Sequence, residues 1–502
     1  MTGESAGRTY RFAPVARSGV VLGLSGLQCT ALAAGVLCSG LLLNLLVHPA
    51  LVVLPLVAGA AVAFAPVAGR PMHEWAPIAV RWAAVLLTGG TTWFGRIPTF
   101  TGHGERRDVE LDLPPALAGL GVHESDASWT RRGRSSGAAV IRDRRQRTVS
   151  ATLRVRGREF SLCERGEQDR LLQLWGDALA GFCRERGAVG RVRWTEWAAP
   201  AGHDEQLAYL DANRHASKDT TPTAIYRELL EQAGPMATRH ETLVTVTVEQ
   251  RRIRRRRHDQ APPAEEVLLE EVRLLVARLE SAGLRVDAPL SPCEIAAVLR
   301  SRLDPYSTPG IAGRRSLANL VGISITNAGP MAQRTAWDHV AIDRAVHAAY
   351  VVAEWPRLDV PANWMEPLLL HAGGIRTMAM LYEPVGPSRS QRQIDRDSTR
   401  LATDEEQRAR TGFRIGARHR RAQGDVASRE AELVAGYAEL EYVGVMVVTA
   451  PDLAALERSC AEYEQVAAQC GIELRRLDGR HDLAVACVLP VGRGIEARRF
   501  AW

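Results

Sequence analysis

Hydrophobic residues concentrate in one run near the amino-terminus, at residues 18–69. This run contains no Asp, Glu, Lys or Arg and consists mostly of Leu, Val and Ala. Because a bilayer core of roughly 30 Å needs about 20 apolar residues per helix, the run has room for two spans. Its strongest turn signal is Asn44–Pro49, so we expect membrane helices near Leu24–Leu43 and Ala50–Val67.

Arginines flank this run on both sides, whereas the turn between the two expected helices carries no charge. They are Arg8, Arg11, Arg17, Arg70, Arg81 and Arg96. Since positive residues stay on the cytoplasmic side, we expect two spans in the cytoplasmic (inner) membrane and both termini in the cytoplasm. A cleaved signal peptide would need a shorter apolar core and a small-residue cleavage site. A buried helical hairpin of a soluble protein is the remaining alternative.

Behind the apolar run, the periodicity alternates between that of strands and that of helices. The expected strands are Ala138–Ile141, Thr148–Val155, Val189–Trp197, Glu241–Glu249, Ile375–Pro384, Val443–Thr449, Ile472–Leu477 and Leu483–Leu489. The expected helices are Met72–Leu87, Glu167–Arg186, Leu207–Arg214, Thr223–Gln232, Glu265–Ala282, Ser388–Tyr437, Ala454–Cys470 and one that ends near Arg302. That last helix should begin with a capping box formed by Ser291 and Glu294, with Pro292 at its first position.

We predict an α+β protein, with an amino-terminal transmembrane helical hairpin followed by cytoplasmic ferredoxin-like α+β units. The order of the last elements, β-α-β-α-β-β, is close to such a unit. The predicted parts are a cytoplasmic segment (1–22), the hairpin (23–69), an interfacial helix and linker (70–107), a first α+β region (108–330) and a second (331–502).

Two short segments resemble each other and suggest an internal repeat. The sequence Ala-Gly-Leu-Arg-Val-Asp at 282–287 parallels Cys-Gly-Ile-Glu-Leu-Arg at 470–475, and both follow an expected helix. Two related α+β halves would explain this likeness. Chance would explain it too, because Gly commonly ends a helix.

The helix expected at Met72–Leu87 places Trp75 and Trp82 on one apolar face. Two Trp side chains beside a membrane suit a helix that lies in the interface, with these residues as its anchors. An ordinary amphipathic helix packed on the soluble body is the alternative.

The composition favours a bacterial protein in a reducing compartment. Lys218 is the only lysine among 63 basic residues, a bias that fits a GC-rich genome. The eight cysteines form no C-x-x-C motif and have no His spacing for zinc. We therefore expect neither disulfides nor a metal site, and no cofactor.

No motif for catalysis or nucleotide binding stands out. The phosphate-binding G-x-x-x-x-G-K-[ST] loop is absent, and the sole lysine has no Gly-rich turn before it. The segment Gly133–Gly137 matches a nucleophile elbow, but no apolar strand precedes it, so a hairpin turn is the better interpretation. We expect a chain that is not an enzyme and does not bind or hydrolyse ATP.

The strongest local charge is the sequence RRIRRRR. It contains Arg251, Arg252, Arg254, Arg255, Arg256 and Arg257. Anionic lipid headgroups or an acidic partner surface would attract such a run, and so would nucleic acid. We do not expect direct nucleic-acid binding, because the aromatic residues that stack on bases are missing. A solvated loop between a strand and a helix is the remaining alternative.

Several sequence blocks, in order along nearly the whole chain, carry a resemblance to a known family. They are Gly69–Pro71, Glu74–Pro77, Glu167–Asp169, Tyr350–Arg357, Pro367–Leu370, Arg376-Thr377, Glu383–Val385, Ser428–Leu433, Val448–Ala450 and Pro490–Gly494. With these blocks the chain resembles actinobacterial membrane-anchored proteins of type IV secretion-like, conjugation-related gene clusters.

The resemblance implies a hairpin similar to the small two-helix inner-membrane subunit of type IV secretion systems. It also implies a soluble part similar to the non-ATPase, amino-terminal region of the secretion ATPase, and it carries over no catalytic residue. We therefore expect a non-enzymatic inner-membrane scaffold in an oligomeric assembly. Its expected partners are a secretion or DNA-transfer ATPase, other inner-membrane subunits and anionic lipid. A type VII-like translocon component and a membrane-tethered enzyme are the alternatives.

Overall fold

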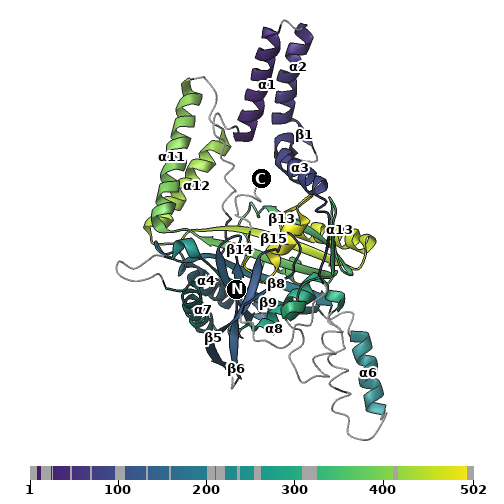
Figure 1. Ribbon diagram of the computed structural model, residues 1–502. Coiled ribbons are helices and arrows are strands. Elements are labelled where there is room, and N and C mark those ends of the chain that lie inside the picture. The colour runs from purple at the N-terminus through teal and green to yellow at the C-terminus, as the bar shows by residue number, and fades with distance from the viewer. Residues whose placement is uncertain are drawn as a thin grey trace.

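One large antiparallel sheet runs through the body of the protein, and helices cover both of its faces (Figure 1). This computed structural model describes residues 8–12, 24, 26–45, 48–67, 70–96, 108–131, 134–157, 160–200, 210, 221–233, 238–253, 262–307, 325–410 and 416–494. The mixed α+β class expected from the sequence is confirmed.

The sheet has fourteen strands among the described residues. In chain order they are β3 (Thr92–Phe94), β4 (Asp108–Glu110), β5 (Leu120–Arg131), β6 (Arg134–Asp143), β7 (Thr148–Arg156), β8 (Val189–Pro200), β9 (Thr238–Glu249), β10 (Arg285–Pro289), β11 (Ala332–Thr335), β12 (Val340–Ile342), β13 (Ala345–Glu354), β14 (Ile375–Pro384), β15 (Leu440–Ala450) and β16 (Glu473–Arg476). They lie side by side as β3-β11-β12-β13-β15-β14-β8-β9-β7-β6-β5-β4, with β10 beside β7 and β16 beside β13.

The helices fall into three groups. Near the amino-terminus are α1 (Gly26–Asn44), α2 (Pro49–Phe64) and α3 (Met72–Leu87), with the short strands β1 (Pro66–Val67) and β2 (Arg70–Pro71) between α2 and α3. Against the sheet are α4 (Arg165–Ala180), α7 (Ala264–Ser281), α8 (Pro292–Leu303), α10 (Glu366–Leu369), α13 (Leu453–Gln469) and α14 (His481–Val488). Projecting from the body are α6 (Thr221–Ala233), α11 (Pro387–Arg410) and α12 (Ala417–Val434) (Figure 1).

The body consists of two halves with the same order of elements. The first half runs β7-α4-β8-β9-α7-β10 and the second runs β13-α10-β14-β15-α13-β16, apart from helices inserted at the same place in each half, α6 between β8 and β9 and α11–α12 between β14 and β15. In the sheet their strands lie as β10-β7-β9-β8 and β16-β13-β15-β14, so equivalent strands take equivalent places. Strands β8 and β14 join the halves as antiparallel neighbours, with Trp194 opposite Met380. The similar segments 282–287 and 470–475 lie at the equivalent junctions α7–β10 and α13–β16.

Hydrophobic cores lie on both faces of the sheet. On one face, α4 and α7 pack on the first half and α13 packs on the second. On the other face, α8 and α14 pack against both halves, for example through Leu299 and Val485. Because both faces of the central strands are covered, β15 reads as a continuous apolar run rather than an alternating one.

Helix boundaries with a local signal match the sequence best. Helix α3 has the predicted bounds, and α8 begins with the predicted capping box, since Ser291 and Glu294 each accept a hydrogen bond from the other's backbone N–H. Strands β5 and β6 pair with Arg131 opposite Arg134, so residues 134–137 of the elbow-like segment lie on β6, and Gly133 lies outside the described residues.

Four expectations about elements are wrong. The segment Leu483–Leu489, expected as a closing strand, is helix α14, because a short apolar run that is buried all round does not distinguish strand from helix. The helix expected to reach Arg186 ends at Ala180, before Gly181. The single helix expected at Ser388–Tyr437 is two helices, and β3 lies within the predicted linker. The helix expected at Leu207–Arg214 lies outside the described residues, apart from Leu210.

Candidate functional site

The helices α1 and α2 bury their small residues and expose their large ones. A side chain on Gly35 would place its Cβ 2.8 Å from the Pro55 carbonyl oxygen, and one on Gly59 would place it 2.9 Å from the Ala31 carbonyl oxygen. By contrast, Leu37 is 73% exposed and Leu54 is 64% exposed. Close backbone contact through small residues is typical of helices that associate in lipid. By length and composition α1 could cross a membrane, whereas α2 is shorter.

Helix α3 connects this pair to the body through two tryptophans. Trp75 and Trp82 both contact Trp337, with ring centroids 6.0 Å and 5.6 Å away. Arg81 forms an ion pair with Asp482 at 2.9 Å. Both predicted interfacial anchors thus face the body, and their contact with lipid stays a prediction. The outer side of α3 is also apolar, since Val80 and Leu87 are exposed.

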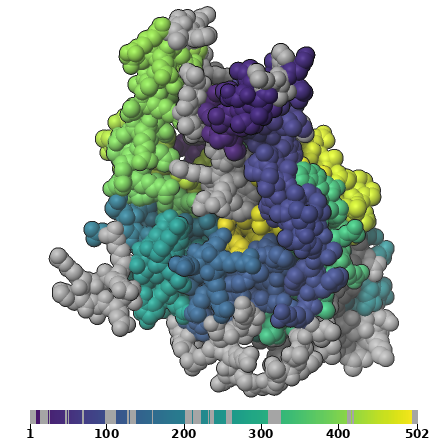
Figure 2. Space-filling model, turned by 45° about the horizontal axis from the view of Figure 1, so that its top comes forward, coloured from purple at the N-terminus to yellow at the C-terminus, as the bar shows by residue number. Residues whose placement is uncertain are grey.

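A cavity of about 1030 Å³ lies between α3, the start of α1 and the strand ends of the first half. Eight arginines and three glutamates line it, which leaves five more positive than negative side chains. We call it the arginine cavity; its arginines are Arg81, Arg145, Arg147, Arg191, Arg251, Arg252, Arg389 and Arg480. Figure 2 shows α1–α3 and α11–α12 on two sides of the molecule, with yellow atoms of the carboxy-terminal part of the body visible between them.

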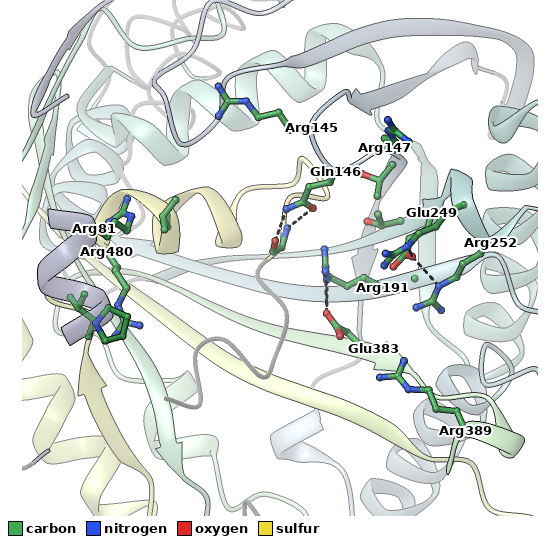
Figure 3. Close-up of a pocket in the computed structure, with 18 of the residues that line it drawn as sticks. Arg81, Arg145, Gln146, Arg147, Arg191, Glu249, Arg252, Glu383, Arg389 and Arg480 are labelled. Carbon is green, nitrogen blue, oxygen red and sulfur yellow. Dashed lines mark hydrogen bonds and ion pairs between the residues drawn. The ribbon is translucent and has the colours of Figure 1, made fainter. Parts of the chain in front are cut away.

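The ends of several strands bring these arginines together (Figure 3). Arg145 and Arg147 belong to the turn between β6 and β7, and Arg191 lies near the start of β8. Arg251 and Arg252 follow the end of β9, and Arg389 lies in the first turn of α11. Because these strands are antiparallel neighbours, β8 begins where β9 ends, and β9 ends beside the start of β7.

Glutamates hold part of the arginine cavity in place. Arg191 forms an ion pair with Glu383 at 3.0 Å, which crosses from β8 to β14. Glu249 accepts from Arg251 at 2.6 Å and from Arg252 at 3.0 Å. Burial alone would raise the pKa of Glu249, but these two arginines outweigh that effect and lower the pKa below its usual value.

The other end of the cavity holds a buried arginine among like charges. Burial, together with the positive charges of Arg70 and Arg81, lowers the pKa of Arg480 to about 10. A cluster of positive charges in a concave and partly buried place attracts anions. The arrangement can therefore bind negative groups.

The predicted basic run lies partly in this site. Arg251 and Arg252 line the cavity, whereas Arg254, Arg255, Arg256 and Arg257 lie outside the described residues. The other six arginines of the cavity were missed as binding residues by the sequence analysis. The sequence RDRRQR at 142–147 offered a signal, since four of its six residues are basic and a turn brings them close together.

Among the described residues, no group of three or more His, Cys, Asp or Glu side chains is placed to hold a metal ion. Three of the described cysteines, Cys183, Cys460 and Cys470, lie in the interior, and burial raises the pKa of each of their thiols. A thiol with a raised pKa is a poor nucleophile.

Comparison with known protein families finds no family that matches the chain, and comparison with curated proteins finds no match.

Proposed function

We propose that this protein is a non-enzymatic scaffold of the inner membrane, in which α1 and α2 form a transmembrane hairpin and the body lies in the cytoplasm. In keeping with the resemblance described above, the scaffold would belong to a type IV secretion-like or conjugative DNA-transfer apparatus and hold its ATPase at the membrane.

The main support for this proposal is that α1 and α2 expose their large apolar side chains and bury their small residues. A helical pair in water gains stability by burying Leu and Val, at about 25 cal/mol for each Å² of apolar surface. Here Leu37, Leu41 and Leu54 face outward while Gly35 and Ser39 are buried. Lipid tails around the pair would cover those outward side chains, whereas water would not.

Helix α3 fits the same placement. Its inner side is fixed to the body by Trp75, Trp82 and Arg81. Its outer side presents Val80 and Leu87, the latter 88% exposed. We propose that this outer side lies in the lipid interface.

We also propose that each half of the body is a ferredoxin-like unit. The support is the order β-α-β-β-α-β in each half, with the fourth strand beside the first, the first beside the third and the third beside the second. The second half departs from this plan in its first helix, α10, which has only four residues.

The helices α11 and α12 are our candidate surface for the ATPase. They are inserted between β14 and β15 and rise on the same side of the sheet as α1 and α2 (Figure 1). Charged and polar side chains dominate α11, and only Ser390 and Ile394 of its residues are buried. Such charge excludes α11 from hydrocarbon, so its exposed surface is available to a protein partner near the membrane.

Two alternatives lead to different observations. A type VII-like translocon component would share the membrane plan but would co-purify with components of that system. A membrane-tethered enzyme would need a nucleophile or an acid–base pair in a cavity. The arginine cavity is lined by three glutamates, His73, Thr148 and Thr247, and by no Ser, Cys or Lys among the described residues.

Cysteine labelling tests the membrane placement. The eight native cysteines are first replaced, and a single cysteine is then introduced as His48→Cys or Asp287→Cys. An impermeant reagent applied to intact cells should label the first variant and not the second. Labelling of Asp287→Cys in intact cells would refute the topology.

Mild cross-linking followed by purification in detergent tests the partner. We expect to recover an ATPase and to find no ATP hydrolysis by the chain alone. Hydrolysis by the purified chain would refute the non-enzymatic role, and recovery of no ATPase would refute the scaffold role.

A further inference from the structure

The arginine cavity has more positive charge than its own acidic residues neutralise. Of its eight arginines, Arg191, Arg251 and Arg252 are paired with the lining residues Glu383 and Glu249, and Arg81 and Arg389 reach Asp482 and Glu441 outside the lining. Arg145 and Arg147 have no ion pair within 4.0 Å among the described residues.

Arg147 stands out because its backbone conformation is unfavourable for its type. Its φ angle is 53°, in the left-handed region that favours glycine. Asp343 has a similar φ of 49° in the equivalent turn of the second half, but its carboxylate accepts hydrogen bonds from Met331 N and Ala332 N, both at 2.8 Å. No hydrogen bond or ion pair of the Arg147 side chain occurs among the described residues, so no internal contact explains an arginine there.

We propose that the arginine cavity binds a phosphate group, carried either by an anionic lipid headgroup or by a free anion. Guanidinium groups match phosphate oxygens with two parallel hydrogen bonds. The cavity volume of about 1030 Å³ is at the upper end of the range for small-ligand sites. Its lining includes Leu27 of α1 and Pro77 of α3, so it opens beside the proposed membrane anchor. The lipid source rests on the function proposed above, whereas the free anion does not.

Arg147→Gly is a variant that separates binding from folding. Glycine adopts a φ of 53° without strain, so this change should raise the melting temperature while it removes one guanidinium. Arg389→Gln removes a second guanidinium from a different element. Arg156→Gln is the matched control, because Arg156 lies on β7 at the end far from the cavity and is exposed.

Isothermal titration of the detergent-solubilised full chain measures the binding. The probes are inorganic pyrophosphate and short-chain phosphatidylglycerol, with short-chain phosphatidylcholine as the neutral control. We expect Arg147→Gly and Arg389→Gln to weaken binding of the anionic probe about tenfold or more, the usual loss when a hydrogen bond to a charged group is removed. Arg156→Gln should keep the wild-type affinity, and added salt should weaken all of the binding.

The two probes identify the source of the phosphate. Binding of pyrophosphate alone would indicate a free anion, and binding of phosphatidylglycerol alone would indicate a headgroup. Absence of binding to both probes would overturn the proposal, and so would equal affinities of the wild type, Arg147→Gly and Arg389→Gln. A chain that binds pyrophosphate but fails the labelling test would refute the membrane placement and leave the phosphate site standing.

Discussion

Arg493 and Asp143 form a two-point ion pair although 350 residues separate them in the chain. The Nε atom of Arg493 donates to Asp143 Oδ2 at 2.8 Å, and its Nη2 atom donates to Oδ1 at 2.9 Å. The same guanidinium donates to the carbonyl oxygens of Ala116 at 2.6 Å and Ala118 at 3.0 Å. With Asp143 only 1% exposed and Arg493 6% exposed, this pair fixes the segment after α14 onto the first half.

Loss of one partner of this pair should destabilise the protein strongly. Arg493→Met leaves the Asp143 carboxylate buried without its main counter-charge, and breaking a buried pair in this way costs about 3–5 kcal/mol. We expect a clear fall in the melting temperature of the purified full chain. The double variant Arg493→Gln with Asp143→Asn removes both charges and should be less destabilised than the sum of its single variants.

The control for this experiment is an exposed pair. Arg170 and Glu167 lie 3.0 Å apart on α4, and exposed pairs contribute about 0–1 kcal/mol. Arg170→Gln should therefore leave the melting temperature nearly unchanged. An equal loss in Arg493→Met and Arg170→Gln would show that the buried pair has no special role.

Gly492 should tolerate no side chain. Its φ angle is +70°, and a Cβ atom there would overlap the hydroxyl oxygen of the buried Ser150 side chain. The left-handed conformation alone costs a residue with a side chain about 1–2 kcal/mol, and the clash adds to it. We expect Gly492→Ala to lower the melting temperature markedly, whereas Gly416→Ala, which meets no atom within 4 Å, should have little effect. A wild-type melting temperature for Gly492→Ala would contradict the packing described.

The stability should fall in mild acid, partly because of His347. This side chain is buried on β13, with Nδ1 2.9 Å from the Thr449 hydroxyl oxygen and Nε2 3.0 Å from the Leu303 carbonyl oxygen. Burial lowers the pKa of His347 from 6.5 to about 4. The unfolded chain therefore binds a proton that the folded chain excludes, and stability is lost as the pH falls from about 6.5 to 4.

The size of this effect follows from the shift in pKa. At 1.36 kcal/mol for each unit, His347 contributes about 3 kcal/mol across that window. His347→Gln should flatten the dependence of unfolding on pH between 7 and 4, as measured by denaturant titration at each pH. His339→Gln, a change in the half-buried turn before β12, is the control. Identical pH dependence in the wild type and His347→Gln would refute the assignment.

The helices α11 and α12 should be removable without loss of the sheet. Strands β14 and β15 pair along their whole lengths, and Pro384 lies opposite Leu440 at the end where α11 begins. Deletion of residues 387–436 leaves a five-residue connection, a common length for a hairpin. We expect a folded protein with a cooperative melt that no longer co-purifies with the ATPase. Retention of the ATPase would place its binding surface elsewhere on the chain.

Local signals made parts of this fold predictable. The capping residues Ser291 and Glu294 mark the start of α8, and the spacing of Trp75, Ile78 and Trp82 marks one side of α3. No such signal distinguishes α14 from a strand, because its residues are apolar on every side. The partner of the two tryptophans, Trp337, could not be inferred either, since packing between distant segments leaves no local pattern.

The arginine cavity shows the same limit. Arg251 and Arg252 were expected to bind anions because they are consecutive in the chain. Arg191 and Arg389 come together through the pairing of β8 with β9 and with β14, and Arg480 reaches the cavity from the segment between β16 and α14. A single sequence contains no information on that register, so the basic run was visible and the cavity was not.

Because β8 pairs with β14, each half needs the other to cover this strand edge during synthesis and purification. Seven consecutive pairs, from Arg376 opposite Ala198 to Tyr382 opposite Val192, close the seam. A fragment cut near residue 330 would expose that seam as an open strand edge, which is a template for association with other chains. Such fragments should form dimers or aggregates where the intact chain does not. In the intact chain the two halves thus pair as the two subunits of a dimer would, and they are always present in equal number because one chain contains both.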